Sequence, residues 1–213
     1  MILLLSGVSG SGKSTACSIA ARYAVDSGRR VGGVICAALF EHGQKSGISC
    51  AALREGRTVQ LGILARARPD WIVPRMPPEA GSARPLFSVP FDDTDPHIIR
   101  YGMWAFERTI LSKADETAAA YLLDLRASAG LPPLIIIDEI GPLELDRSIG
   151  MVKTLRLLDH LAAGAGKEAC HVVVARPDIA ARLQKRWPAA VVLVIEAGQA
   201  DQTAREIILR SIW

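Results

Sequence analysis

The stretch from Gly7 to Ser14 constrains this chain more than any other part of its sequence. It reads Gly-Val-Ser-Gly-Ser-Gly-Lys-Ser, and it stands between a short apolar run and a segment with helical periodicity. Glycines at this spacing let the backbone fold around a polyphosphate and turn its N–H groups inward. The helix that follows adds the positive end of its dipole. A glycine-rich turn with an accidental Lys-Ser is the alternative, but the flanking strand and helix favour a phosphate-binding loop.

This loop, a Walker A motif or P-loop, predicts a nucleotide site with defined roles. Lys13 is expected to reach the β- and γ-phosphates and to assist catalysis, and the Ser14 hydroxyl is expected to ligate Mg²⁺. The nucleotide-binding residues predicted from the motif are Gly7, Val8, Ser9, Gly10, Ser11, Gly12, Lys13, Ser14 and Thr15.

Composition limits the alternatives. The chain has 213 residues, of which 50% are apolar, which is enough for one well-buried α/β domain spanning 1–213. A net charge of +3 is too small to imply a nucleic-acid or membrane partner. The apolar run at 1–5 is too short for a signal peptide, and no window approaches the ~20 apolar residues of a membrane span. We therefore expect a soluble, cytoplasmic protein with no nucleic-acid partner.

The four cysteines indicate packing rather than chemistry. Cys17, Cys36, Cys50 and Cys170 form no Cys-x-x-Cys pair and have no metal-ligand spacing with any histidine. All four stand among apolar neighbours, where a free cysteine behaves as a small hydrophobic residue. We expect reduced thiols in the core.

Periodicity in the first third predicts an α/β fold with an insertion. A buried strand is expected at 2–6 and a helix at 13–27, ended by Gly28. Three strand-like runs follow without a helix between them, at 31–39, 47–54 and 58–65. Because a P-loop core alternates strand and helix, the sequence predicts a doubly wound, mainly parallel sheet with an antiparallel hairpin or meander at about 31–66.

The middle of the chain is less regular. Residues 66–85 are rich in Pro and Arg, which predicts an exposed loop that is a lid, a binding loop or locally disordered. A strand is expected at 86–91 and a long helical tract, with a possible break, at about 98–127. Alternation then returns, with strands expected at 134–138, 171–175 and 190–195 and helices at 148–163, 178–186 and 201–212.

A second motif follows the apolar run Leu134-Ile135-Ile136-Ile137. It places Asp138 at the carboxyl end of a buried strand, the edge where open α/β sheets bind ligands. An acid there matches the Walker B role of holding Mg²⁺ against the nucleotide. Glu139, the next residue, is suited to polarise an attacking water. The alternative is that Asp138 only starts a turn and that Glu139 is solvated.

The Asp-Glu pair also favours a particular strand order. In P-loop proteins that activate water with such a glutamate, another strand usually lies between the P-loop strand and the Walker B strand, and the strand at 171–175 is the candidate. Arg176 would then lie between Lys13 and Asp138, where an arginine can sense the γ-phosphate and stabilise charge. An ion pair with a surface acid, or a role in positioning the helix begun by Pro177-Asp178, are the alternatives for Arg176.

Several of these motifs together resemble those of a known family. The P-loop, Gly32-Gly33, the run Lys45-Ser46-Gly47-Ile48 and, above all, the run from Asp138 to Leu145 (Asp-Glu-Ile-Gly-Pro-Leu-Glu-Leu) are similar to the P-loop nucleoside triphosphatases related to the cancer-related nucleoside triphosphatase and its archaeal and thermophile relatives. The chain departs from the family pattern after Gly33 and resembles a divergent member.

The resemblance implies Mg²⁺-dependent hydrolysis of the terminal phosphate of ATP, GTP and other nucleotides with low base selectivity. By motif match, Lys13 and Ser14 contact phosphate and metal, Asp138 holds the metal and Glu139 orients the water. Glu144 matches a motif residue, and a structural helix cap is equally open for it. Two other functions stay open: a nucleotide or small-molecule kinase, and a nucleotide-driven switch that acts on a partner protein.

Overall fold

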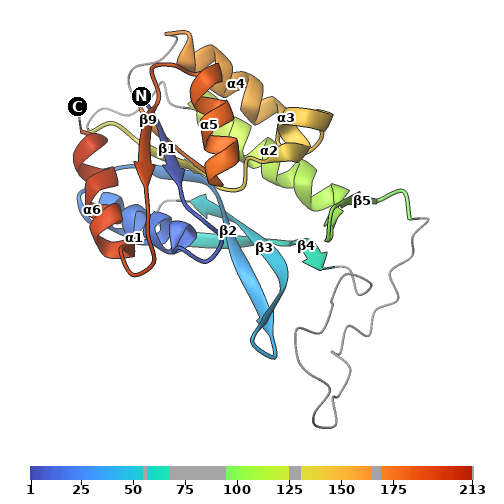
Figure 1. Cartoon of the computed structure of the whole chain (residues 1–213). Helices are drawn as coiled ribbons and strands as arrows, with labels where there is room; N and C mark the ends of the chain where they lie inside the picture. Colours follow the sequence, from blue (N-terminus) through green and yellow to red (C-terminus); the bar gives the residue numbers. More distant parts are fainter. Residues whose placement is uncertain (55–56, 68–94, 125–130, 165–168, 213) are drawn as a thin grey trace.

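The computed structural model describes residues 1–54, 57–67, 95–124, 131–164 and 169–212 and gathers their strands into one sheet (Figure 1). The strands are β1 (Ile2–Ser6), β2 (Val31–Glu41), β3 (Gln44–Arg54), β4 (Arg57–Ala67), β5 (Ile98–Tyr101), β6 (Trp104–Glu107), β7 (Leu134–Ile137), β8 (Cys170–Ala175) and β9 (Val191–Val194). The helices are α1 (Lys13–Asp26), α2 (Arg108–Leu123), α3 (Pro142–Arg147), α4 (Val152–Ala162), α5 (Pro177–Arg186) and α6 (Ala200–Arg210).

Strand order identifies a parallel core with an antiparallel extension. The order across the sheet is β5-β6-β4-β3-β2-β7-β8-β1-β9. The five strands from β2 to β9 in this order are parallel, and the pairs from β2 to β5 are antiparallel. The predicted α/β class and the doubly wound sheet with an antiparallel insertion are confirmed. The position of β8 between β1 and β7 is confirmed as well.

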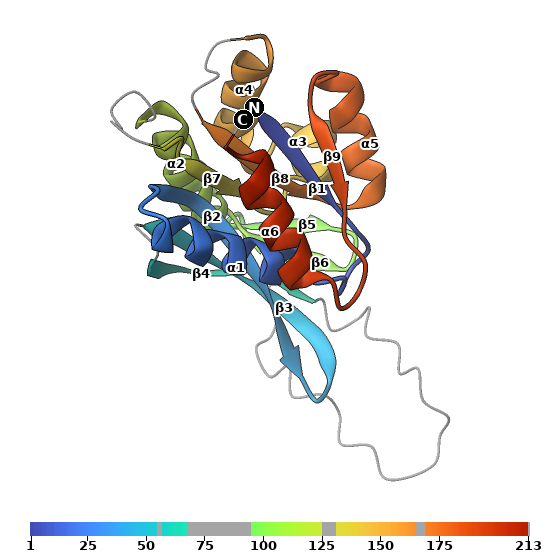
Figure 2. The same ribbon diagram turned by 90° about the vertical axis from the view of Figure 1, so that its left-hand side faces the viewer.

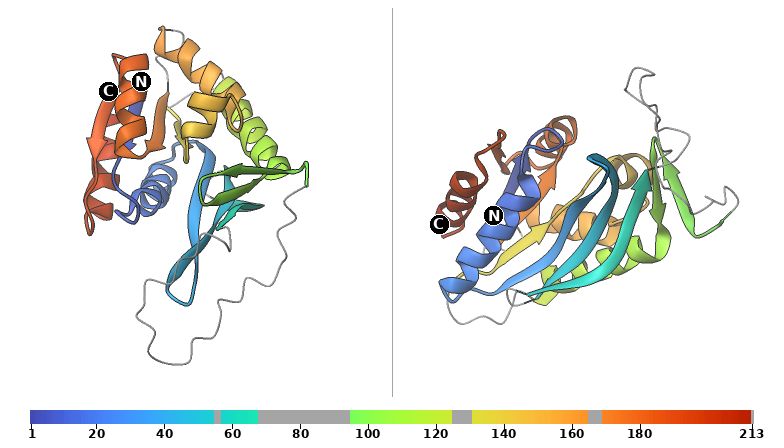
Figure 3. Two further views of the ribbon diagram at one scale, coloured as in Figure 1. Left: turned by 45° about the vertical axis from the view of Figure 1, so that its right-hand side comes forward. Right: turned by 90° about the horizontal axis from the view of Figure 1, so that it is seen from below.

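Helices cover both faces of the core, because the central strands are apolar on both sides (Figures 2 and 3). Leu3 and Leu5 face α1 and α6, whereas Ile2 and Leu4 face the layer made by α2, α4 and α5. Fully burying one such leucine stabilises the fold by roughly 1.5–3 kcal/mol. The rigid core holds the carboxyl ends of β1, β7 and β8 at one edge.

The antiparallel extension begins as a continuation of the core. Val34 is the last β2 residue paired with β7, and β2 then runs on to Glu41 with only β3 beside it. His42 and Gly43, both with positive φ (50° and 76°), turn the chain back. The β2–β3 hairpin therefore projects beyond the carboxyl edge of the parallel strands (Figures 1 and 2).

Gly32 and Gly33 let β2 lie close to its neighbours. A Cβ at Gly33, whose φ is +113°, would lie 2.0 Å from the carbonyl oxygen of Ile136 on β7. A Cβ at Gly32 would lie 2.2 Å from the ring of Tyr121 on α2. The paired glycines of the sequence motif thus have a packing role on both sides of β2.

Three sequence predictions need correction. The helical tract expected at 98–127 is wrong for its first ten residues, which form the β5–β6 hairpin around Gly102 (φ +56°) because β6 pairs with β4. The helix expected at 148–163 starts later, at Val152, because Ser148 and Gly150 adopt left-handed backbone angles, and the separate helix α3 precedes it. Arg66 and Ala67 belong to β4 rather than to the predicted loop. The rest of that loop and the strand expected at 86–91 lie outside the described residues.

Two further findings concern the cysteines and the helices. All four cysteines are buried free thiols, as predicted, and Cys36 faces Cys50 across β2 and β3. No helix in the described part of the chain is long and apolar enough to cross a bilayer.

Candidate active site at the carboxyl edge of the sheet

The P-loop links the end of β1 to the start of α1. Gly10 and Gly12 have φ values of +82° and +94°, which side-chain-bearing residues rarely adopt. A Cβ at Gly7 would lie 2.5 Å from the Ser11 hydroxyl and 2.7 Å from the Ile195 carbonyl oxygen. The glycines of the motif are therefore needed for backbone geometry. The helix begins directly after Gly12, so its free N–H groups lie at this edge.

Lys13 spans the P-loop with its side chain. Its Nζ donates 2.7 Å hydrogen bonds to the carbonyl oxygens of Gly7 and Val8. Burial lowers the pKa of Lys13, while the charges of Glu139 and Asp138 oppose that shift and those of Lys45 and Arg176 add to it. The ammonium group therefore stands among two acids and two further cations.

Asp138 follows β7 and is buried, with 1% of its surface exposed. Its Oδ2 accepts a 2.8 Å hydrogen bond from the Ser14 hydroxyl and a 3.0 Å hydrogen bond from the Cys36 backbone N–H. Burial, and then the charge of Glu139, raise the pKa of Asp138 to about 7. A bound cation would favour the charged form, so the pair made by Ser14 and Asp138 is suited to a metal ion.

Glu139 is oriented differently from its neighbour. Its φ of +76° is a left-handed conformation that costs about 1 kcal/mol or more for a residue with a side chain. Asp138 is buried against the P-loop, whereas Glu139 is exposed. Strained backbone of this kind is often found at functional sites. The turn therefore buries the Asp138 carboxylate against the P-loop and exposes the Glu139 side chain to solvent.

Arg176 directly follows β8 and precedes the first residue of α5. It is exposed and has no ion-pair partner among the residues that the structure describes, so the alternative of a surface ion pair does not hold there. Its charge acts on Lys13. Because β8 lies between β1 and β7, Arg176 emerges between the P-loop and Asp138, as the strand order predicted.

Glu144 has a structural position. It is buried, and its two carboxylate oxygens accept hydrogen bonds from the backbone N–H groups of Gly141 (2.9 Å) and Met151 (3.1 Å). A Cβ at Gly150 would lie 2.1 Å from Glu144 Oε1. The carboxylate caps α3 and ties the segment after Glu139 to the start of α4, which is the helix-cap alternative left open by the sequence.

The sequence analysis did not predict two contacts at or near the candidate site. The backbone N–H of Cys36 fixes the Asp138 carboxylate, and no residue type signals such a contact in the sequence. The sequence places Lys45 in a family motif without giving it a role. In the structure its Nζ lies 5.0 Å from the centre of the Trp104 ring. The available signal for Lys45 is the run Lys45-Ser46-Gly47-Ile48, one of the motifs that carry the family resemblance.

The donor set fits Mg²⁺ better than a metal held wholly by protein. No cluster of three or more His, Cys, Asp or Glu side chains that could hold a metal occurs in the described ranges. Mg²⁺ commonly takes one or two protein oxygens and completes its shell with phosphate and water. The Ser14 hydroxyl and the Asp138 carboxylate are oxygen donors of this kind.

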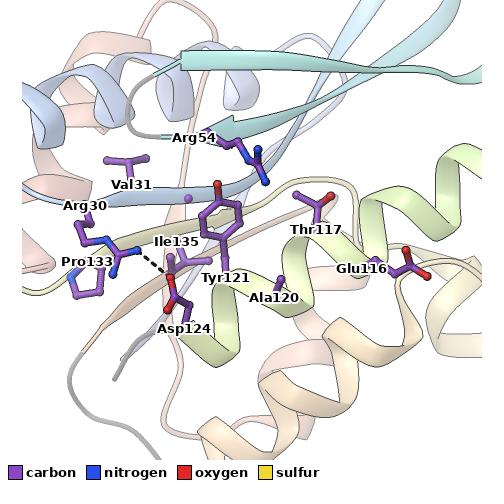
Figure 4. A pocket seen from close by; sticks show the side chains of 11 residues that line it. Arg30, Val31, Arg54, Glu116, Thr117, Ala120, Tyr121, Asp124, Pro133 and Ile135 are labelled. Atoms are coloured by element: carbon purple, nitrogen blue, oxygen red, sulfur yellow. Dashed lines mark hydrogen bonds and ion pairs between the residues drawn. The ribbon is translucent and has the colours of Figure 1, made fainter. Parts of the chain in front are cut away.

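A cavity of about 660 Å³ lies elsewhere, between α2 and the amino ends of β2 and β7 (Figure 4). Tyr121 points into it beside Arg54, and an ion pair of 2.8 Å joins Arg30 to Asp124 at its side. None of the predicted site residues lines this cavity. The predicted site residues lie at the opposite, carboxyl edge of the parallel strands.

Comparison with known proteins relates this chain to a family. Residues 2–70, which include the P-loop and the first antiparallel strands, match the model of a family described as NTPase. The chain is related to the P-loop NTPases. The predicted resemblance is thereby confirmed, and the family match supports nucleoside triphosphatase activity.

Two solved structures share the fold. The solution structure of a human cancer-related nucleoside triphosphatase superposes with a TM-score of 0.59 at 18% identity, covering 98% of this chain and 95% of that one. The crystal structure of THEP1 from the hyperthermophile Aquifex aeolicus gives a TM-score of 0.55 at 17% identity, covering 99% of both chains. At such identities the likeness concerns the fold. A search of curated proteins finds no match.

Proposed function

We propose that this P-loop NTPase relative hydrolyses the terminal phosphate of ATP, GTP and other nucleoside triphosphates in a Mg²⁺-dependent reaction with low base selectivity. One arrangement carries the proposal. The Ser14 hydroxyl contacts the Asp138 carboxylate, and Glu139 projects into solvent directly beside them. Two candidate metal ligands and a candidate general base therefore lie next to the P-loop.

The roles of the residues follow from their positions. The P-loop N–H groups, from Gly7 to Thr15, bind the phosphates, and Lys13 exchanges its carbonyl partners for phosphate oxygens. Ser14 and Asp138 would hold Mg²⁺, which when bound supplies positive charge at the β- and γ-phosphate oxygens. Glu139 orients a water molecule for attack on the terminal phosphorus and accepts its proton.

Arg176 completes the proposed machinery as a charge-stabilising group. It has no ion-pair partner within the described ranges and lies between the P-loop and Asp138. An arginine there stabilises the charge that develops on the transferred phosphoryl group. Low base selectivity is supported by the family resemblance and by the P-loop chemistry, which addresses phosphates rather than bases.

The test is a phosphate-release screen over ATP, GTP, CTP and UTP with and without Mg²⁺, alongside the Lys13→Ala variant. We expect release from several nucleotides, none without Mg²⁺, and none from the variant. The same screen repeated with small phosphate acceptors separates hydrolysis from transfer. Phosphate that appears on an acceptor rather than in solution would replace the hydrolase proposal with the kinase alternative.

A further inference from the structure

Lys45 and Trp104 form a contact at one end of the antiparallel extension. The Lys45 Nζ lies 5.0 Å from the centre of the indole ring, which is cation–π geometry. Both side chains are only partly exposed. An ammonium group held over an aromatic face has fewer available positions than one on a free lysine, so the ring determines where the charge points.

Strand pairing explains why these two residues meet. Gly47 on β3 pairs with Arg66 on β4, and Ala67, the next β4 residue, pairs with Trp104 on β6. Lys45 and Trp104 are therefore at the same end of the extension, two strands apart. That end includes the β2–β3 hairpin, which projects beyond the carboxyl edge of the parallel core (Figures 1 and 2).

Three cationic side chains near the P-loop favour the binding of an anion. Lys45 and Arg176 both act electrostatically on Lys13. None of these three cations has an ion-pair partner in the part of the chain that the structure describes. Asp138 and Glu139 also act on Lys13, but neither forms an ion pair with any of the three cations. The three like charges repel one another, and a bound polyanion reduces that repulsion.

We propose that Lys45 contacts the terminal phosphate of the bound nucleotide and that the Trp104 ring positions it for this contact. The inference rests on the proposed function. Strand order favours the terminal phosphate over the base: Asp138 follows β7, which lies on the β2 side of β1, and the extension that carries Lys45 continues from β2. Lys45 thus approaches from the side of the metal ligands rather than from the side of β9.

The first experiment measures binding rather than turnover. Calorimetry with Mg²⁺ and a non-hydrolysable ATP analogue, and separately with ADP, compares wild type with Lys45→Met, which keeps the length of the side chain and removes its charge. We expect the analogue to bind roughly tenfold or more weakly and ADP to bind within about threefold of wild type, because ADP lacks the contacted phosphate. Lys45→Arg should retain most of the affinity, and Lys185→Met on the exposed face of α5 should change neither value.

The second experiment tests the positioning role of Trp104. Trp104→Leu keeps an apolar side chain without an aromatic face, whereas Trp104→Phe keeps a ring. We expect Leu, but not Phe, to weaken analogue binding while ADP binding stays the same. The double variant Lys45→Met/Trp104→Leu should lose no more than Lys45→Met alone, because the ring acts through the lysine.

Three outcomes would overturn the inference: unchanged binding of the analogue by Lys45→Met, equal loss of analogue and ADP affinity in that variant, or additive losses in the double variant. None of these measurements depends on catalysis. If wild type binds the analogue but releases no phosphate, the proposed hydrolysis fails while the contact made by Lys45 is still measured. If wild type hydrolyses ATP and Lys45→Met binds the analogue normally, the inference fails alone.

Discussion

Ser14 and Asp138 are 124 residues apart in the sequence, and the hydroxyl of the first donates a 2.8 Å hydrogen bond to the carboxylate of the second. The P-loop supplies one partner and the end of β7 supplies the other, although β7 is not adjacent to β1 in the sheet. The contact crosses over β8. Both oxygen atoms thereby meet where a metal ion could bridge the protein and a nucleotide.

Asp138→Asn tests this role of the carboxylate. The amide oxygen still accepts hydrogen bonds from Ser14 and Cys36, so we expect the variant to fold. Because it lacks the charge that attracts a divalent cation, the Mg²⁺ concentration for half-maximal phosphate release should rise by about tenfold or more. Titration of phosphate release against Mg²⁺ measures the change, with Asp146→Asn on the exposed side of α3 as control. An unchanged Mg²⁺ requirement would exclude Asp138 as a ligand.

Glu139→Gln separates binding from chemistry. Glutamine has the same shape but accepts a proton poorly, so nucleotide and Mg²⁺ should bind as in wild type while hydrolysis falls by ~10²-fold or more. Calorimetry and single-turnover phosphate release measure the two quantities. Normal hydrolysis by this variant would assign the activation of water to another residue.

Arg176→Ala should affect the transfer step more than ground-state binding. The side chain is exposed between the P-loop and Asp138, and the phosphate that it is proposed to sense is absent from ADP. We expect turnover to fall by at least tenfold while the dissociation constant of ADP changes little. Parallel losses in both measurements would instead assign Arg176 to general electrostatic attraction. Arg186→Ala, at the far end of α5, is the matched control.

The sequence predicted those parts of the fold in which local pattern and chemistry coincide. Glycine spacing located the P-loop, and four apolar residues before Asp138 located β7. The Asp138-Glu139 pair even predicted that β8 lies between β1 and β7. In each case the signal is contained within about ten consecutive residues.

What the sequence did not reveal depends on partners distant in the chain. Residues 98–107 form strands because β6 pairs with β4, a contact that no local periodicity encodes. The contact between Lys45 and Trp104 requires the same pairing. The role of Glu144 also depends on how the chain turns after α3, since one of its two hydrogen-bond donors is the backbone N–H of Met151, beyond the end of that helix.

Glu144→Ala should destabilise the fold by about 2–4 kcal/mol, because two backbone N–H groups lose their acceptor in a buried setting. Glu144→Gln keeps one acceptor and should cost less. Urea unfolding gives both values. The control is Asp146→Ala on the same helix, which removes only an exposed ion pair with Arg182 and should change the free energy of unfolding little. If Glu144→Ala were as mild as this control, the capping role would be wrong.

We expect His171 to make the stability of the folded protein depend on pH. It lies fully buried on β8; its Nδ1 is 3.1 Å from the Met1 carbonyl oxygen, and its Nε2 has no hydrogen-bond partner among the described residues. Burial lowers its pKa from 6.5 to about 4. Between these values the unfolded chain binds a proton that the folded protein does not, so stability contributed by the neutral ring is lost as pH falls from 6.5 towards 4.

His171→Leu isolates this contribution, since the Met1 carbonyl oxygen keeps its hydrogen bond from the backbone N–H of residue 171. The free energy of unfolding of wild type should fall, relative to the variant, by on the order of 3 kcal/mol across that interval. Because Asp138 and Glu144 titrate in both proteins, their effects cancel in the difference. Urea unfolding at pH 7, 6, 5 and 4 measures it. A difference that stays constant with pH would mean that His171 has the same pKa in the folded protein as in the unfolded chain, and the prediction would be wrong.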